Sequence, residues 1–386
     1  RWHEENGAKF EDVGQWKRPW FYPRGSESME EAVNRECMSV RNGVGILDAS
    51  TLGKIDIQGP DAAEFLTRVY TNSFLNLAPG KCRYGVMLKE DGMIFDDGVC
   101  TCLGSNHYLM FTTTGGAAKV LSWLELWRQT EWPELKVYFT SVTDHWGTIT
   151  VNGPDARKVL QQVCVGTNLD NDSFPFMEWR DAVVAGVDAR IFRISFTGEL
   201  SFEINVPAHY SRHVWEVLID AGESFDITPY GTEAMHVLRA EKGFMIVGQD
   251  TDGSMTPHDM GMGWVVNKSK EFSFIGKRSL DRSDMLRKNR KQFVGLKTIE
   301  SSKMLPEGGQ LVFDSNDKIP MSMQGHVTSS YYSPILGYPI ALGVVKGGFG
   351  RMGQIVYSPL ADGNSIPAEI VSAVFYDSDG ARQNVE

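Results

Sequence analysis

The chain has 386 residues, of which 42% are hydrophobic and 23% charged, so it is long enough to form two or three domains with substantial cores. A formal net charge of −11 at pH 7 argues against a surface for nucleic acid or anionic membranes. No apolar run approaches the roughly 20 residues of a membrane helix. We therefore expect a small molecule or another protein as the partner.

The cysteines and the first residues indicate the setting of the chain. No two of the five cysteines are spaced as CxxC, and their odd number fits a reducing cytoplasm better than a disulfide scaffold. The first 23 residues are rich in aromatic side chains but lack the basic and apolar regions of a signal peptide. We predict a cytoplasmic protein and interpret Arg1 as a cut edge within a longer polypeptide.

The first predicted elements are a helix and an internal repeat. Ser28 and Glu31 have the spacing of a capping box, which predicts a helix that Gly43 ends. Residues 53–69 and 147–163 are identical at eight of seventeen positions, and each copy runs from an alternating strand through a Gly-Pro-Asp-Ala turn into a helix.

This repeat predicts two duplicated domains with a site at the seam between them. Pro60 and Pro154 suit the first helical position, where a missing N–H costs nothing. The period of 94 residues is too long for a solenoid and suits whole domains. The alternative is that a common helix start arose twice by chance.

Further elements follow each copy. After the first, Asp91-Gly92 and Ser105-Asn106 indicate turns between strands, and a helix is expected afterwards. From about residue 293 onward, short strands separated by Gly, Pro, Ser and Asp predict an all-β domain, and the basic stretch 278–291 before it indicates a solvated helix or linker. The expected helices are 117–127, 210–221 and 232–241, and the strands after the second copy are 183–187, 189–196 and 200–206.

Two motifs do not support the function that they first suggest. The GxGxxG of residues 348–353 is followed by QIVYS, which indicates a strand instead of the helix that dinucleotide phosphates need. His209 and His213 lie four apart without the glutamate of an HExxH motif. We predict no metal site, and no flavin or NAD site within this chain.

Acidic residues on predicted strands give more information about a site than these two motifs do. Asp96 and Asp97 are adjacent on a predicted strand, where alternation lets only one of them point into a core or cleft. Glu203 lies on another strand, and an inward position would raise its pKa, although a solvent-facing acid is the plainer alternative. Arg239, on the predicted helix 232–241, is a candidate partner for Glu203 or for Glu199.

Several blocks resemble a known family. In chain order, they are GVGILDASTLGKIDIQGPDAAEFL, GKCRYGVMLKEDGMIFDDGV, FTGELSFEINVP, VLRAEKG, TPHDMGMGWVV and GHVTSSYYSPILGYPIALGVV. Together they resemble the glycine-cleavage T-protein (aminomethyltransferase) superfamily over nearly the whole chain from about Ser28 onward. The opening GAKFEDVGQWKRP and the TTTGGAA stretch at 112–118 are more narrowly similar to the C-terminal half of the alpha subunit of heterotetrameric sarcosine oxidase.

The resemblance implies an α+β fold of the T-protein type, a three-domain cloverleaf with tetrahydrofolate bound in the middle. Two duplicated α+β domains are expected from residues 1–52 with 141–250 and from residues 53–140 with 251–288. Residues 289–386 are expected to form the C-terminal all-β domain.

The resemblance also implies site residues. Glu203 matches a family carboxylate, and one carboxylate can accept the N3–H and 2-amino group of a pterin as a bidentate pair. Asp97 matches the catalytic aspartate, with Asp96 facing away. Phe196 stands where the family usually has Tyr, which removes a hydroxyl contact but keeps an aromatic ring. The implied cofactor contacts besides Glu203 are Tyr84, Phe196, Leu52, Thr113, Arg239 and Trp264.

The implied activity is one-carbon transfer within a hetero-oligomeric amine oxidase. The imine from sarcosine oxidation and tetrahydrofolate would give 5,10-methylenetetrahydrofolate and glycine, with Asp97 stabilising the cationic donor and accepting a proton. Flavin and NAD are expected on an upstream half or on partner subunits.

Other functions on this fold remain open. They are a stand-alone glycine-cleavage aminomethyltransferase, a folate-dependent demethylase, and a non-catalytic folate-binding module, although the KGCxxGQE cysteine of that last class is replaced by Phe244. The amine that donates the carbon, the oligomeric state and any residues that bind a polyglutamate tail are not predicted.

Overall fold

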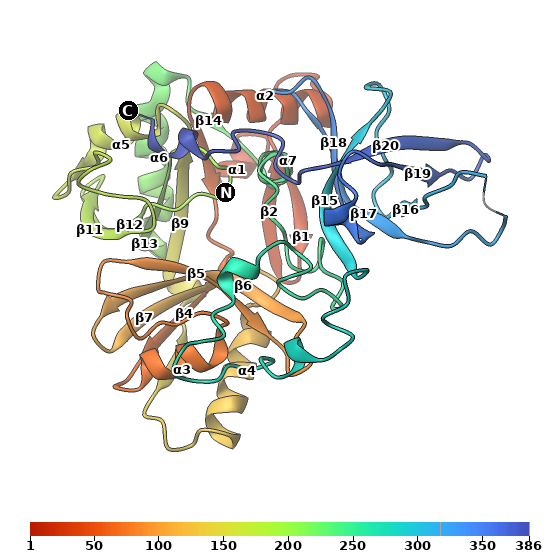
Figure 1. Cartoon of the computed structure of the whole chain (residues 1–386). Coiled ribbons are helices and arrows are strands. Elements are labelled where there is room, and N and C mark those ends of the chain that lie inside the picture. Colours follow the sequence, from red (N-terminus) through yellow and green to blue (C-terminus); the bar gives the residue numbers. More distant parts are fainter. Residues whose placement is uncertain (317, 386) are drawn as a thin grey trace. The chain divides into compact units, whose positions relative to one another are not determined.

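The structure is a computed structural model that describes residues 1–316 and 318–385. The chain divides into two compact units, and Figure 1 labels helices and strands of the chain. Unit 1 consists of residues 1–85, 96–236 and 380–386, and unit 2 of residues 86–95 and 237–379. No helix among the described residues is long and apolar enough to cross a membrane.

The larger sheet of unit 1 has seven strands, and all neighbours pair antiparallel except β3 and β14, which are parallel. Helices α5 (Ala156–Val163) and α6 (Ser211–Gly222) contribute Leu160, Trp215 and Leu218 to one buried cluster with the inward residues of its strands. In sheet order the strands are β10 (Cys164–Val165), β11 (Trp179–Val184), β12 (Val187–Phe192), β13 (Ser201–Pro207), β9 (Trp146–Asn152), β3 (Gly45–Asp48) and β14 (Thr228–Pro229).

The smaller sheet has five strands, and helices α3 (Ala62–Val69) and α4 (Ala117–Thr130) accompany it. Its strands are, in sheet order, β5 (Cys82–Leu88), β6 (Ile94–Gly104), β7 (His107–Thr112), β4 (Gly53–Gln58) and β8 (Tyr138–Ser141). The sheet belongs to unit 1 apart from residues 86–95, the turn end of the β5–β6 hairpin, which belong to unit 2.

The predicted repeat corresponds to matching topology in the two sheets. In each copy the repeat strand (β4 or β9) leads into an eight-residue helix and a meander, whose last strand (β7 or β13) pairs back with the repeat strand. Each repeat strand also pairs with the strand that precedes the other copy in the chain, because β4 pairs with β8 and β9 pairs with β3. Each copy therefore takes up the strand that precedes the other copy.

The expected start of the repeated helices was wrong by two residues. Pro60 and Pro154 lie in turns, and the helices begin at Ala62 and Ala156. The preceding glycines explain the difference, since Gly59 (φ 140°) and Gly153 (φ 121°) adopt positive φ and direct the chain through a turn before the helix.

The amino-terminal region of unit 1 contains a hairpin and a capped helix. The hairpin pairs β1 (Lys9–Val13) with β2 (Trp16–Phe21), after the short helix α1 (Trp2–Glu5). Helix α2 (Met29–Asn42) has the predicted capping box of Ser28 and Glu31 and ends at Gly43, so this prediction is confirmed.

Unit 2 contains an antiparallel six-stranded sheet, as predicted for an all-β region. Helix α7 (Thr232–Glu241) leads into this unit with its predicted bounds. The GxGxxG motif of residues 348–353 begins on a 3₁₀ helix, η6 (Gly348–Gly350), and a strand follows it as expected. In sheet order the strands are β16 (Gln310–Leu311), β17 (Gly325–Ser333), β18 (Tyr338–Lys346), β15 (Lys291–Thr298), β20 (Ser365–Val371) and β19 (Ile355–Pro359).

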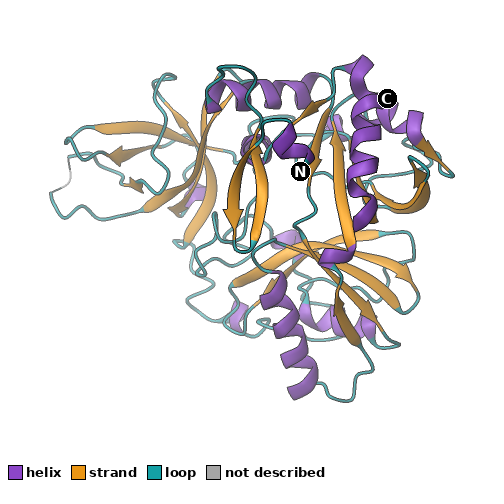
Figure 2. Ribbon diagram, turned by 180° about the vertical axis from the view of Figure 1, so that it is seen from behind, coloured by secondary structure: helices purple, strands orange, loops and turns teal. Residues whose placement is uncertain are grey.

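Short 3₁₀ helices occur in the connections of both units, and the basic stretch 278–291 contains one of them between turns. Figure 2 distinguishes the helices, strands and loops of both units. The other 3₁₀ helices are η1 (Thr143–His145), η2 (Ala208–Tyr210), η3 (Glu223–Phe225), η4 (Gly263–Val265), η5 (Ser279–Asp281) and η7 (Ala381–Asn384). The boundaries of the three predicted domains remain a prediction.

Candidate functional site

Glu203 is a buried carboxylate with an unsatisfied oxygen. It lies on β13 opposite Thr150 of β9 and Phe192 of β12, and it is 8% exposed. Its Oε2 is buried and has no hydrogen-bond donor among the described residues. Ser201 Oγ and Asn205 Nδ2, on the same face of the strand, are likewise buried without a partner. Because buried polar groups are normally satisfied, this face is suited to a ligand that brings its own polar atoms.

The charge of Glu203 depends on a lysine that the sequence did not reveal. Burial raises the pKa of Glu203 to about 7, and the positive charge of Lys54 opposes that rise. Lys54 is itself fully buried on β4, and burial lowers its pKa to about 8. Its Nζ donates to the carbonyls of Ser50 and Leu52, each at 3.0 Å. Lys54 therefore binds the main chain at Leu52, a predicted cofactor contact, and its positive charge also favours the ionised form of Glu203.

Asp97 and Tyr84, both predicted site residues, lie in direct contact. Tyr84, on β5, donates its phenolic hydrogen to Asp97 Oδ2 at 2.6 Å, and Asp97 lies on the neighbouring strand β6. Burial raises the pKa of Asp97 to about 6, while the hydrogen bond from Tyr84 lowers it. Asp97 is therefore mainly ionised at pH 7 and is held in one orientation by the phenol.

Asp96 has a structural role beside Asp97. It is only 2% exposed, and its carboxylate accepts from the Asp97 backbone N–H at 3.0 Å and from Thr113 Oγ1 at 3.3 Å. Burial, followed by the negative charge of Asp97, raises the pKa of Asp96 to about 7. Asp96 thus holds Thr113, a predicted cofactor contact, and the expectation that Asp97 and not Asp96 faces the site stays a prediction.

The seam between the two copies is built from aromatic side chains. Phe111 of β7 and Phe192 of β12 meet edge to face with ring centroids 5.3 Å apart, and Trp179 stacks on Phe192 at 6.3 Å. Trp179 Nε1 also donates to the Cys102 carbonyl at 2.8 Å. Since Phe192 is the cross-strand neighbour of Glu203, this acid lies beside the seam.

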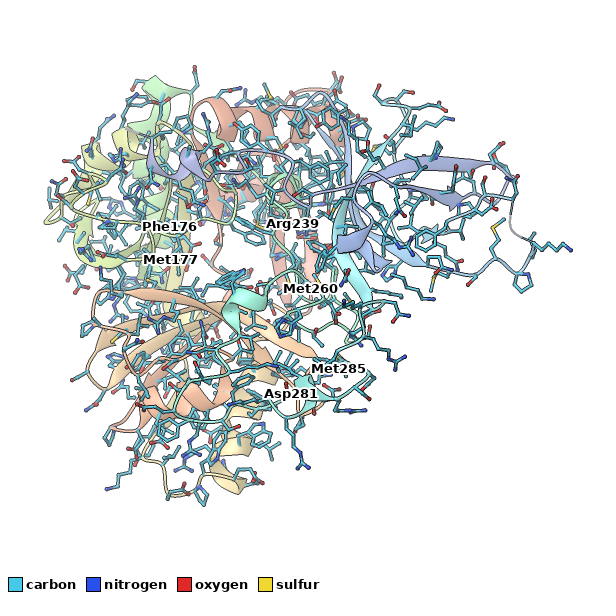
Figure 3. All side chains as sticks on the ribbon, in the orientation of Figure 1. Phe176, Met177, Arg239, Met260, Asp281 and Met285 are labelled. Atoms are coloured by element: carbon cyan, nitrogen blue, oxygen red, sulfur yellow. The ribbon has the colours of Figure 1, made fainter. Side chains whose placement is uncertain are left out.

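The remaining predicted contacts fall in both units. Leu52 and Phe196 are half-buried in unit 1. In unit 2, Trp264 lies on η4 and is 72% exposed. Arg239, labelled in Figure 3, is fully buried on α7.

The predicted pairing of Arg239 with Glu199 or Glu203 was wrong. Arg239 Nη1 forms an ion pair with Asp250 at 2.5 Å, and its Nη2 donates to Ser329 Oγ at 2.7 Å. Glu199 forms ion pairs with two other arginines, Arg41 and Arg382. The sequence did not indicate that Arg382 pairs with Glu199, because the two residues are 183 positions apart.

Asp250→Ala is expected to destabilise unit 2 by about 3–5 kcal/mol, because it leaves the buried Arg239 guanidinium without its counterion. The substitution also removes the acceptor for Thr328 Oγ1 at 2.5 Å. Chemical denaturation of wild type, Asp250→Ala and the exposed control Asp252→Ala checks this expectation. Equal stability of all three would show that the ion pair has no net structural role.

Comparison with known proteins identifies the family. The GCVT N-terminal domain model matches residues 1–270, and the glycine cleavage T-protein C-terminal barrel domain model matches residues 291–377. A solved structure, the glycine cleavage system aminomethyltransferase T from Bartonella henselae, superposes with a TM-score of 0.82 at 27% identity and covers 97% of this chain and 96% of that one. The chain belongs to the glycine-cleavage T-protein (aminomethyltransferase) family, and the predicted fold class is confirmed.

Two curated relatives refine this placement. The chain is 53% identical over 388 residues to the sarcosine oxidase subunit alpha of Corynebacterium sp. (strain U-96), a match that covers 99% of this chain and 40% of that protein. It is 31% identical to the aminomethyltransferase of Halothermothrix orenii, with 89% of each protein covered. The chain therefore spans about 40% of the length of its sarcosine oxidase relative, and the similarity to sarcosine oxidase alpha subunits is confirmed.

Proposed function

We propose that this chain is the tetrahydrofolate-dependent one-carbon transferase part of a sarcosine oxidase alpha subunit. In this proposal it combines the imine produced by sarcosine oxidation with tetrahydrofolate to give 5,10-methylenetetrahydrofolate and glycine. Its partners are the other parts of a hetero-oligomeric oxidase in the cytoplasm, which supply flavin chemistry. The observation that supports the proposal most is the buried, unsatisfied carboxylate of Glu203 at the seam of the duplicated copies.

Glu203 suits a pterin in donor and acceptor pattern. A pterin presents two parallel donors, N3–H and the 2-amino group, and an ionised carboxylate accepts both in a bidentate pair. The free Oε2 supplies one of these acceptors, and Lys54 favours the ionised form that the pair needs. We propose that Leu52, Phe196, Tyr84 and Thr113 of unit 1 line the same site.

Asp97 is proposed to act on the reacting groups. Bound tetrahydrofolate supplies a nucleophilic amine, and the one-carbon donor is an iminium cation. The Asp97 carboxylate would stabilise this cation and accept the proton that the first folate amine loses as its carbon–nitrogen bond forms. The second folate amine would then replace glycine on the carbon, and glycine would leave with the protons that the two amines lose. Tyr84 holds the carboxylate through its 2.6 Å hydrogen bond, and its phenolic hydrogen favours the ionised form.

The affinity for tetrahydrofolate is expected to fall as the pH drops below about 7, because the bidentate pair needs the carboxylate form of Glu203, whose pKa is raised to about 7. Lys54→Met removes the positive charge that opposes this rise, so the midpoint is expected to move to higher pH. Calorimetric titrations from pH 6 to 9 measure both midpoints, and Lys54→Arg should restore the wild-type value. Coincident curves for wild type and Lys54→Met would show that Lys54 does not affect the ionisation of Glu203.

The reaction is tested by assaying the product of the purified chain with tetrahydrofolate and formaldehyde equivalents, in parallel with methylated sulfonium or methoxy donors. We expect methylene transfer with the first and no methyl transfer with the second. Methyl transfer would favour the demethylase alternative, and folate binding without either reaction would favour a non-catalytic module. Aminomethyl transfer from the glycine-cleavage carrier would indicate the stand-alone aminomethyltransferase.

A further inference from the structure

The segment between Phe196 and Glu203 is held by residues distant in the sequence. It contains a turn, which is the bend of residues 196–200 with Gly198 at a positive φ of 82°, and the start of β13. Both ends of this segment carry residues proposed to contact folate. A displacement of the turn would therefore move Glu203, the proposed pterin carboxylate, or Phe196, a proposed folate contact.

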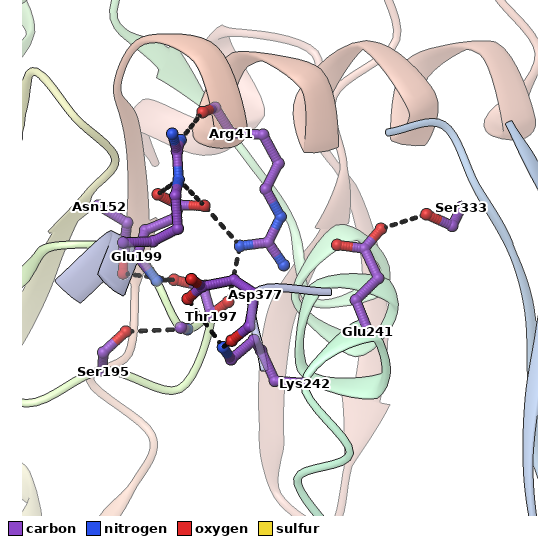
Figure 4. A network of polar contacts seen from close by, with 11 residues as sticks. Arg41, Asn152, Ser195, Thr197, Glu199, Glu241, Lys242, Ser333 and Asp377 are labelled. Atoms are coloured by element: carbon purple, nitrogen blue, oxygen red, sulfur yellow. Dashed lines mark hydrogen bonds and ion pairs between the residues drawn. The ribbon is translucent and has the colours of Figure 1, made fainter. Parts of the chain in front are cut away.

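Arg41, of helix α2, holds the turn from one side. Its Nη1 donates to the Thr197 carbonyl and to Glu199 Oε1, both at 2.8 Å (Figure 4). Arg41 and Glu199 are both fully buried. Burial raises the pKa of Glu199, and the two arginines beside it act against that rise.

The carboxy-terminal segment 380–385 holds the turn from the other side. Arg382 Nε donates to Glu199 Oε2 at 2.9 Å, and its guanidinium also donates to the Arg41 carbonyl. The Arg382 carbonyl accepts from the Leu200 backbone N–H at 3.0 Å, directly before β13 begins. Arg382 thus binds the turn through its side chain and its main chain at once.

Further contacts fix the same segment to unit 1. Arg193 Nη2 donates to the Gln383 carbonyl and to Asn384 Oδ1, each at 3.0 Å. Arg157 Nη1 donates to the Val385 carbonyl at 2.9 Å. The segment is therefore held by hydrogen bonds at each of residues 382–385.

We infer that Arg382 is a positioning residue for the folate site, which acts through Glu199 and Leu200 to set the place of Glu203 and Phe196. This inference rests on the proposed function. Arg382 makes no proposed contact with folate, so its effect falls on the geometry of the binding strand. Asp97 and Tyr84 lie on the other sheet of unit 1, outside the segment that Arg382 holds.

The inference predicts a separation of binding from chemistry. Arg382→Gln is expected to weaken tetrahydrofolate binding about 10-fold or more, as a misplaced binding group does, while the single-turnover rate at saturating folate stays near wild type. Arg212→Gln is the control, because Arg212 is an arginine of unit 1 that forms ion pairs with Glu5 and Glu216 outside the segment held by Arg382. It is expected to bind folate as wild type does.

Hydrogen exchange without ligand tests the physical basis independently of folate. The Leu200 amide and its neighbours in 197–203 are expected to exchange faster in Arg382→Gln than in wild type or Arg212→Gln. Arg382→Lys keeps the charge beside Glu199 and is expected to restore part of the affinity.

The outcomes separate the inference from the proposed function. Unchanged exchange in 197–203 overturns the inference, as does faster exchange with unchanged folate affinity in a wild type that binds. A wild type that does not bind tetrahydrofolate overturns the proposed function, and the positioning role with it. Faster exchange, weaker binding and an unchanged saturated rate support the inference.

Discussion

Glu203→Gln is expected to weaken tetrahydrofolate binding by about 10- to 100-fold, because hydrogen bonds to a charged group are worth about 1.5–3 kcal/mol. In addition, the amide NH2 group would face one of the two N–H donors of the pterin, where the carboxylate offers an acceptor. The substitution preserves the size of the side chain on β13, so the packing around Phe192 should survive. Isothermal calorimetry at pH 8, where the wild-type carboxylate is mainly ionised, measures the difference.

Two controls separate a lost ligand contact from damage to the fold. Glu223→Gln changes an exposed acid of the same unit and is expected to bind normally. Glu203→Gln itself should be at least as stable as wild type at pH 8: burial raises the pKa of Glu203, so the ionised form costs folding free energy above that pKa, and the neutral amide avoids this cost. Equal folate affinity for Glu203→Gln and wild type would remove Glu203 from the site.

Asp97→Asn is expected to slow methylene transfer by about 10²–10⁴-fold, the usual contribution of a general base, with little change in folate affinity. The amide retains a hydrogen-bonding side chain beside Tyr84 but neither carries the negative charge nor accepts a proton. In wild type, the rate is expected to fall as the pH drops through about 6, where Asp97 becomes protonated. Rapid-mixing assays at saturating folate measure both effects.

Asp91→Asn is the control, because Asp91 is an exposed turn residue whose carboxylate accepts only a local backbone N–H from Met93 in the described structure. Tyr84→Phe is expected to cause a smaller loss than Asp97→Asn and to raise the pKa seen in the rate profile, since the phenol lowers the pKa of Asp97. A wild-type rate in Asp97→Asn would exclude a catalytic role.

Local signals predicted much of the fold. The capping box of Ser28 placed helix α2, and the repeated strand and helix marked two copies whose topologies match. The exchange of strands β3 and β8 between the copies was not predicted, because pairing between distant segments leaves no pattern within either segment.

Site residues could be predicted where they matched a family block, but not where their role depends on burial in the folded chain. Glu203 on its strand was consistent with an exposed acid, and only the folded arrangement shows its buried oxygen. Lys54 alternates with Asp56 on β4 as solvent-facing residues do, yet it is fully buried. Arg382 was missed because its partner Glu199 is 183 residues away, which no spacing rule detects.

The central claim is that the duplicated copies each supply one acid, Asp97 and Glu203, to a single folate site. The most direct test is a crystal structure of the protein with bound tetrahydrofolate. We predict that the Glu203 carboxylate lies about 2.7–3.0 Å from both pterin N3 and the 2-amino nitrogen, with Asp97 beside the folate amines that accept the carbon. A pterin bound away from Glu203, or bound there with Asp97 outside contact distance of those amines, would contradict the claim.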